Sequence, residues 1–302
     1  MERIPRSGGP KALDDVCPVC EGLGWVIRED GGAGSAERCD CARRERAQQY
    51  LAFAGIPEGY QDCRLDTFKT HNSNAAVRKT LAKALRICQQ YVADFYDAES
   101  GEYTKTGLLF RGRPGAGKTH LATAVLSEVV QRYQVKGRFV GFTDLMLRLQ
   151  STFDSDSPET RRAVLQPVIE ADFLVLDELG ARRSSDWMMD ILYHIINSRY
   201  TAQRPTLFTT NYRLENLETV EQAKRSLEKE IPFNSDKHAM ESQSGKYLMS
   251  NQKRDGETQA ENLAYWIGPQ LLSRLKEMTV TVHMDVTDYR LQKTPRHVLA
   301  KR

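Results

Sequence analysis

The chain is 302 residues long, and its 43 basic residues nearly balance its 40 acidic residues, which gives a net charge of +3. This length allows about two domains, and the charge balance excludes a protein that binds nucleic acid through a uniformly basic surface. The N-terminal residues MERIPRSGGPKALDD lack the apolar core of a signal peptide, and no later apolar stretch is long enough to span a membrane. We therefore expect a cytoplasmic protein without membrane contact.

Four of the six cysteines lie close together near the N-terminus, at Cys17, Cys20, Cys39 and Cys41. The first pair stands in CPVCEGLGWV and the second in CDC, and the 18-residue spacer between them includes the glycine-rich EDGGAGSAER. Two close pairs joined by a hairpin-length loop can supply four thiolates to a tetrahedral Zn²⁺, whose binding stabilises a module too small for a core. The spacing predicts a zinc-binding module over residues 1–45.

Two other interpretations of the first cysteine pair stay open. A redox pair requires an attacking cysteine at a helix start in a thioredoxin-like unit, and the residues around Cys17 do not resemble one. CPVCEGLGWV also resembles the Cys-x2-Cys-x-Gly-x-Gly repeats of Hsp40 zinc domains, although it is present in one copy. Cys63 and Cys88 lie outside the cluster, and we expect them to be small buried apolar side chains.

Residues 46–75 are predicted to form a helix and a linker. The charged run ARRERAQQYLAFAG has helical character and stops at Gly55 and Pro57, and IPEGYQDCRLDTF follows as an extended segment. The run NAAVRKTLAKALRICQQYVADF then has apolar residues at helical spacing, so a larger domain is expected over residues 76–302.

Short apolar runs alternate with amphipathic helices from residue 107 onward. This alternation indicates an α/β fold with a mostly parallel five-stranded sheet between helices, because each βαβ crossover places a helix on a sheet face. The polar segment 212–262 interrupts the pattern, and we interpret it as an insertion between core elements. The predicted strands are TGLLFRG, GRFVGF, DFLVLDE, PTLFTTN and TVTVHMD, and the predicted helices between them are KTHLATAVLSEVVQRY, TDLMLRLQSTF, ETRRAVLQPVIEA and DWMMDILYHIINSRYTAQ.

The sequence GRPGAGKT matches the phosphate-binding loop pattern G-x-x-x-x-G-K-[ST] between a predicted strand and a predicted helix. Glycines allow backbone N–H groups to surround phosphates, Lys118 reaches the β- and γ-phosphates, and the Thr119 hydroxyl is a Mg²⁺ ligand. A chance glycine-rich turn is the alternative. The predicted ATP-binding residues are Gly112, Arg113, Pro114, Gly115, Ala116, Gly117, Lys118, Thr119 and His120.

Two later strands end in polar residues that complete a nucleotide site. FLVLDELG places Asp177 and Glu178 at the carboxyl edge of the sheet, where ligands of parallel α/β sheets bind. Asp177 is predicted to hold Mg²⁺ with Thr119, and Glu178 to act as general base on the attacking water. LFTTN ends in Asn211, a candidate for orienting that water, although an asparagine at this position can also simply cap a strand.

The succession GRPGAGKT, FLVLDELG and LFTTN resembles the AAA+ ATPases, P-loop NTPases that include the DnaC and DnaI helicase loaders and the IstB transposition helpers. GPQLLSRL resembles the arginine-finger segment of that clade, which implies that Arg274 completes a neighbouring subunit's site, although Gln270 stands where relatives often carry another arginine. DYR resembles the closing motif and implies Arg290 as a second sensor. Either arginine can instead be a solvated surface charge.

The resemblance also implies partners. An arginine finger acting in trans requires a homo-oligomer on ATP binding, and the clade's extra helical element contacts single-stranded DNA. Loaders of the DnaI type carry an N-terminal zinc module that contacts a DnaB-type replicative helicase. The candidate DNA contacts, which can also be ordinary solvated residues, are Arg148, Phe153, Arg161, Arg162, Arg182 and Arg183.

The sequence therefore predicts an ATPase, with ATP, Mg²⁺ and Zn²⁺ as cofactors, that loads a replicative helicase on single-stranded DNA. One alternative is an IstB-like transposition helper that acts on duplex DNA. Another is a zinc-organised adaptor that binds ATP as a structural ligand and hydrolyses little of it.

Overall fold

The computed structural model of the chain describes residues 16–28, 35–72, 74–153, 159–180, 185–214, 262–286 and 288–289. Arg182, Arg183, Arg290 and residues 215–261 of the predicted insertion lie outside the described residues. Within the described part, no helix has both the length and the apolar character needed to cross a membrane.

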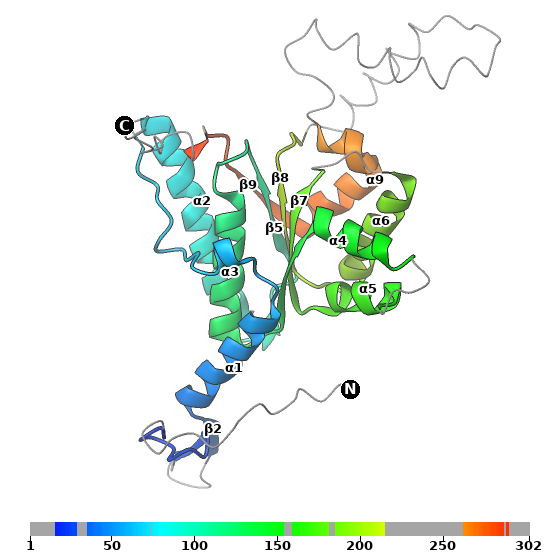
Figure 1. Cartoon of the computed structure of the whole chain (residues 1–302). Coiled ribbons are helices and arrows are strands. Elements are labelled where there is room, and N and C mark those ends of the chain that lie inside the picture. Colours follow the sequence, from blue (N-terminus) through cyan, green and yellow to red (C-terminus); the bar gives the residue numbers. More distant parts are fainter. Residues whose placement is uncertain are drawn as a thin grey trace, which may run out of the picture.

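The N-terminal module is a two-stranded antiparallel hairpin of β1 (Trp25–Arg28) and β2 (Ser35–Arg38). The helix α1 (Asp40–Phe53) follows directly and leads toward the larger domain (Figure 1). The end of this helix packs on the larger domain. Ala54, the residue directly after the helix, is fully buried, and its carbonyl accepts a hydrogen bond from the Phe139 N–H at 2.6 Å. A short 3-10 helix, η2 (Glu58–Tyr60), begins the linker.

The larger domain is built on five parallel strands in the order β6-β7-β8-β5-β9, which confirms the predicted sheet. All five predicted strand segments form strands. The three central strands β5, β7 and β8 are almost entirely buried, as expected for a sheet covered on both faces, whereas the edge strands β6 and β9 are only partly buried. Their bounds are β5 (Gly107–Arg111), β6 (Gly137–Gly141), β7 (Phe173–Leu179), β8 (Thr206–Thr210) and β9 (Thr279–His283).

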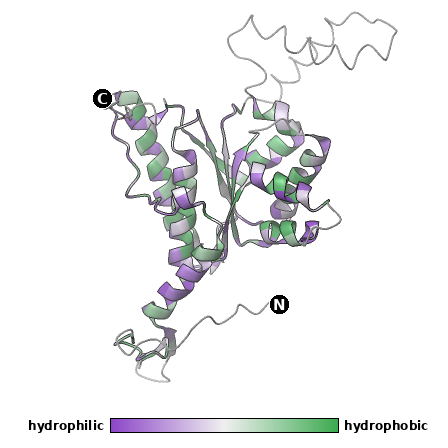
Figure 2. Ribbon diagram, viewed as in Figure 1, coloured by the Kyte–Doolittle hydropathy of each residue, from purple (hydrophilic) through white to green (hydrophobic). Residues whose placement is uncertain are grey.

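Two separate apolar cores lie on the two faces of the sheet. Helices α2 (Ala75–Ala93) and α3 (Lys118–Tyr133) cover one face, together with the end of α1 (Figure 1). Hydrophobic residues follow the strands and the helical surfaces beside them, while α1 is mainly hydrophilic (Figure 2). The opposite face is covered by α4 (Phe142–Ser151), α5 (Arg161–Glu170), α6 (Asp186–Thr201) and α9 (Leu263–Met278).

Three smaller features complete the fold: a short hairpin, a kink in α9 and a bridge between the ends of the predicted insertion. A small hairpin of β3 (Tyr96–Asp97) and β4 (Glu102–Tyr103) follows α2. The helix α9 contains Gly268 with φ of 77° before Pro269, so the two halves of the helix meet at a kink. The ends of the predicted insertion meet in a bridge between Arg213 and Asn262, so the segment leaves and re-enters the domain at one place.

Candidate functional site

The glycine-rich loop connects the end of β5 to the start of α3, at the carboxyl edge of the sheet. Gly117 precedes the helix with φ of 90°, a left-handed conformation that side chains disfavour. A Cβ at this position would also lie 2.8 Å from the Phe68 ring. Glycine is therefore required at Gly117 by both the backbone and the close approach of the linker.

Lys118 is buried and its Nζ is surrounded by oxygens. It donates hydrogen bonds to the carbonyls of Gly112 and Arg113, each at 2.9 Å, and to Asn211 Oδ1 at 2.7 Å. The structure thus joins the predicted loop lysine to the predicted water-orienting asparagine, although 93 residues separate them in the sequence.

Asp177 meets the hydroxyl that was predicted to share its metal ion. The Thr119 hydroxyl donates to the carboxylate at 3.0 Å, and the Thr209 hydroxyl donates to Asp177 Oδ1 at 2.5 Å. Burial raises the pKa of Asp177, and these two hydrogen bonds oppose that effect. Hard oxygen donors of this kind suit Mg²⁺, so Thr119 and Asp177 fit the predicted metal site.

Glu178 is exposed and points away from the core in an unusual backbone conformation. Its φ is 61°, which costs a residue other than glycine on the order of 1–3 kcal/mol and persists only where surrounding contacts hold it. Here β7 bulges, because Leu176 pairs with Phe208 and Leu179 pairs with Thr210, leaving Asp177 and Glu178 opposite Thr209. Bulges redirect side chains beside active sites, and this one separates the two carboxylates.

These groups surround a cavity of about 570 Å³, which also includes residues of the 46–75 linker. Pro114 through His120 line it together with Glu178 and Asn211. The linker contribution was not predicted, because an extended polar segment carries no local pattern that assigns it to a pocket. The lining residues from the linker are Gly59, Tyr60, Cys63, Thr67, Phe68, Lys69, His71 and Asn72.

The predicted binding residue His120 is held against this linker. Its ring centroid lies 5.3 Å from that of Phe68, and a hydrogen bond of 3.1 Å joins His120 Nε2 to the carbonyl of Arg64. Cys63 is buried, as predicted, and burial raises its pKa. Cys88 is also buried, and its burial raises the pKa of its thiol to about 12.

The segment after β9 lies against the phosphate-binding loop. The Tyr289 N–H donates to the Gly115 carbonyl at 3.1 Å, and a Cβ on Gly115 would overlap the Asp288 carboxylate. Tyr289 also lines the cavity. The predicted sensor Arg290 follows immediately in the sequence, outside the described residues.

Arg274 does not line the cavity but lies on α9, beside α6. Its guanidinium is stacked over the Tyr193 ring at 4.9 Å from the centroid. One of its nitrogens, Nη1, is buried without a hydrogen-bond partner in the described part of the protein. A buried unpaired N–H costs about 1–3 kcal/mol.

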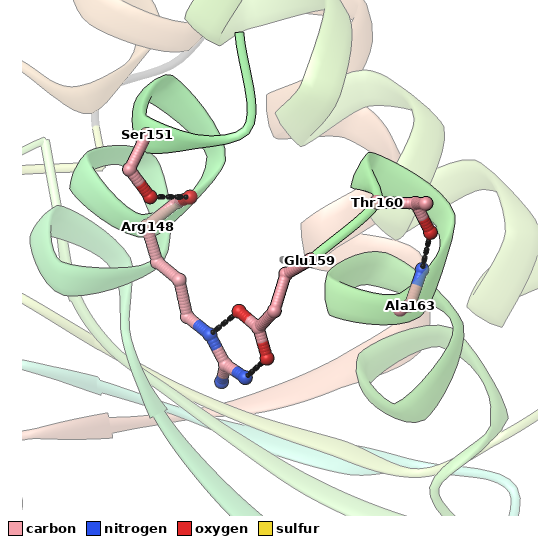
Figure 3. A network of polar contacts seen from close by, with 5 residues as sticks. All are labelled: Arg148, Ser151, Glu159, Thr160 and Ala163. Carbon is pink, nitrogen blue, oxygen red and sulfur yellow. Dashed lines mark hydrogen bonds and ion pairs between the residues drawn. The ribbon is translucent and has the colours of Figure 1, made fainter. Parts of the chain in front are cut away.

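The candidate DNA contacts are not equivalent. Arg148 makes a two-pronged ion pair with Glu159, with Nε 2.7 Å from Oε2, so its charge is already partnered (Figure 3). The Arg161 guanidinium instead lies 4.5 Å over the exposed Phe153 ring, which packs 5.5 Å from Trp187. Arg162 is exposed and bonds to Gln166 on its own helix.

The four predicted zinc ligands come together at one point. All four sulfurs lie within 4.8 Å of one another, with Cys17 and Cys39 3.8 Å apart and Cys20 and Cys41 3.3 Å apart. A tetrahedral zinc with Zn–S bonds near 2.3 Å places its sulfurs about 3.8 Å apart, so the cluster fits this ion. Hydrogen bonding from the Cys20 and Val19 backbone lowers the pKa of Cys17 to about 6, whereas hydrogen bonds with Cys20 and Cys39 raise the pKa of Cys41 to about 12, so the four thiols share protons rather than titrate independently.

Comparison with known proteins shows that this chain is similar to ATP-binding proteins. Residues 81–226 match the family described as IstB-like ATP binding protein. The chain is 25% identical to the phage-like element PBSX protein XkdC of Bacillus subtilis (strain 168) over 212 residues, 68% of this chain and 76% of that protein. It is 27% identical to the replicative helicase loader DnaC of Escherichia coli (strain K12) over 195 residues, 65% of this chain and 74% of that protein.

A solved structure supports the same relationship. The crystal structure of the DnaC helicase loader superposes with a TM-score of 0.52 at 27% identity, covering 76% of this chain and all of that one.

Proposed function

Because the chain carries an IstB-like ATP-binding domain with the AAA+ fold of the DnaC helicase loaders, we propose that it is an ATP-hydrolysing helicase loader. One observation carries this proposal: Lys118, Thr119, Asp177, Glu178 and Asn211 converge at one edge of the sheet, beside a cavity of about 570 Å³. That volume lies within the range of pockets that hold ligands of nucleotide size.

In this proposal the cavity binds ATP, and each residue has a separate role. Lys118 exchanges its carbonyl partners for the β- and γ-phosphates, and Thr119 with Asp177 would hold Mg²⁺, which offsets phosphate charge when bound. Glu178 accepts a proton from the attacking water at its carboxylate, since its side chain is exposed at the cavity. Asn211 orients this water after its Oδ1 is released by Lys118.

Arg274 is proposed to act on the ATP of a neighbouring copy. Its position on α9, away from the cavity of its own subunit, supports a contact in trans. Such an interface joins different surfaces of two copies, so it produces a ring or an open spiral. We expect turnover to rise steeply with protein concentration.

The zinc module is proposed to dock on the replicative helicase. Its described surface exposes large apolar side chains, with Val19 at 67%, Leu23 at 77% and Ile27 at 73% exposure. Exposed apolar side chains gathered in a small module favour a protein partner over solvent. Phe153 and Arg161, where a guanidinium already lies on an aromatic ring, are the proposed contacts for single-stranded DNA.

The decisive experiment measures assembly. Full-length protein is mixed with a DnaB-type helicase, ATP and a single-stranded oligonucleotide, and complex formation is followed by size-exclusion chromatography with light scattering. We expect a complex that weakens with Leu23→Asp, which removes an apolar docking contact, and with Lys118→Ala, which removes a contact to the phosphates of ATP. Absence of any complex with the wild-type protein under these conditions would refute the loader proposal.

A second candidate is a transposition helper, which the match of residues 81–226 to the IstB-like family favours. Such a protein would coat duplex DNA rather than load a helicase on a single strand. Fluorescence anisotropy with duplex and single-stranded oligonucleotides of equal length distinguishes the two. Tighter ATP-dependent binding to the duplex would favour the transposition helper.

A further inference from the structure

A side chain of β8, the neighbouring strand, accepts a hydrogen bond from the backbone of the bulge in β7. Asp177 and Glu178 both lie opposite Thr209, so one of the two backbone positions has no ordinary ladder partner on β8. The Glu178 N–H donates instead to Thr209 Oγ1 at 2.9 Å. Thr209 therefore replaces a missing backbone acceptor with its hydroxyl.

The same hydroxyl also contacts the neighbouring carboxylate. Thr209 Oγ1 donates to Asp177 Oδ1 at 2.5 Å. A threonine hydroxyl has one hydrogen to donate and two lone pairs to accept, so both contacts can be made at once. Thr209 is almost fully buried, although it lies at the wall of the cavity.

These two bonds explain the conformation of Glu178. Its φ of 61° is a strained value that persists only when surrounding contacts over-determine it. The hydrogen bond to its N–H fixes the peptide that precedes the strained residue. The carboxylate of Glu178 is thereby directed to the cavity, while that of Asp177 stays beside Thr119.

We propose that Thr209 is a positioning residue for ATP hydrolysis, holding the bulge that aims Glu178 at the attacking water. This inference rests on the proposed hydrolytic function. Thr209 acts through Glu178 and Asp177, and its removal should change turnover far more than ATP affinity.

The adjacent residue supplies a matched control. Thr210 is also fully buried, and its hydroxyl donates to the Leu179 carbonyl at 2.9 Å and accepts from the Tyr212 N–H at 3.2 Å. It lines the same cavity and makes the same number of hydrogen bonds as Thr209, but its hydroxyl bonds to neither carboxylate. Thr210→Val therefore measures the cost of removing a buried hydroxyl from the same strand.

The kinetic test compares wild type with Thr209→Val, Thr209→Ser and Thr210→Val. We expect Thr209→Val to lower kcat roughly 10- to 100-fold, as misplacement of a catalytic group does. The Kd of a fluorescent ATP analogue should stay within about threefold, since a uniform binding contact is not lost. Thr209→Ser retains the hydroxyl and should recover most of kcat. Equal kcat values for Thr209→Val and Thr210→Val would overturn the proposal.

A double-mutant cycle tests whether Thr209 acts through the glutamate. In a Glu178→Gln background, Thr209→Val should lower turnover by less than about threefold, because residues that act as a unit are not additive. Multiplicative losses would contradict the proposed role.

Crystal structures of the Thr209→Val and Thr210→Val variants give a readout independent of activity. We expect Glu178 to leave its positive φ in the first and to keep it in the second. If Glu178 keeps its conformation in both, Thr209 is not the positioning residue. If the wild-type protein hydrolyses no ATP, the proposed activity fails, and these structures still decide the role of Thr209.

Discussion

The nucleotide cavity and the zinc module are stabilised in different ways. At the cavity, Lys118 is buried in its wall and Asp177 is buried beside it, at the edge of a sheet that has an apolar core on each face. In the hairpin module, the buried side chains are Cys20 and Cys39, while Leu23 and Ile27 are exposed. One region is formed by burial of apolar surface, and the other is proposed to depend on zinc held by its four cysteines. They should therefore respond independently to mutation.

Loss of the metal ligands is expected to have the largest effect and to leave the cavity intact. Binding of structural zinc contributes on the order of 10–16 kcal/mol to the folding of small modules, so Cys20→Ser should unfold the hairpin. Zinc content and hydrogen exchange of residues 16–41 measure this, with the ATP Kd as the internal reference. Cys88→Ser, at a buried cysteine outside the cluster, should retain zinc. A zinc-free hairpin that is still protected from hydrogen exchange would show that the module does not depend on the metal ion.

Truncation tests where the boundary between the cysteine module and the larger domain lies. Deletion of residues 1–45 should leave the stability of the remaining chain nearly unchanged. Deletion of residues 1–75 should lower its free energy of unfolding by about 3 kcal/mol or more, because Ala54 and Leu65 are buried against the domain. Urea unfolding of the two truncated proteins provides the measurement. Equal stabilities would show that the linker is not part of the domain.

Substitution of the proposed general base affects the cavity alone. Glu178→Gln removes the proton acceptor, and we expect kcat for ATP to fall by about 100-fold or more. The zinc content should not change. Turnover measured at a protein concentration where oligomers form checks this prediction. Unchanged turnover would favour the adaptor in which ATP is a structural ligand.

The smallest predicted effect concerns the contact between loop and linker. Gly117→Ala adds a Cβ at φ of 90° and 2.8 Å from the Phe68 ring, so ATP affinity should fall by about tenfold. Gly59→Ala is the control, because Gly59 also lines the cavity but has open space around its Cα. Calorimetric titration with ATP measures both. Equal ATP affinities of the two variants would show that the Phe68 ring moves to accommodate the added Cβ.

The sequence predicted most of the fold because its signals are local. Strands such as FLVLDEL and helices such as KTHLATAVLSEVVQRY form at the predicted positions, since periodic apolar residues have a buried face available in the parallel sheet. The phosphate loop and the two cysteine pairs were also recognisable, because their spacing is required by the ligands they fit.

Contacts between distant segments were decided only by the tertiary structure. Arg148 was expected to be available to DNA, but Glu159 occupies its guanidinium. Phe68 and Asn72 line the nucleotide cavity although their linker has no recognisable motif. Thr209 lies near the carboxyl end of β8, which ends at Thr210 directly before Asn211, and ligands of parallel sheets bind at that edge. Its role depends on a bulge in another strand, and pairing register between strands arises only when the sheet assembles.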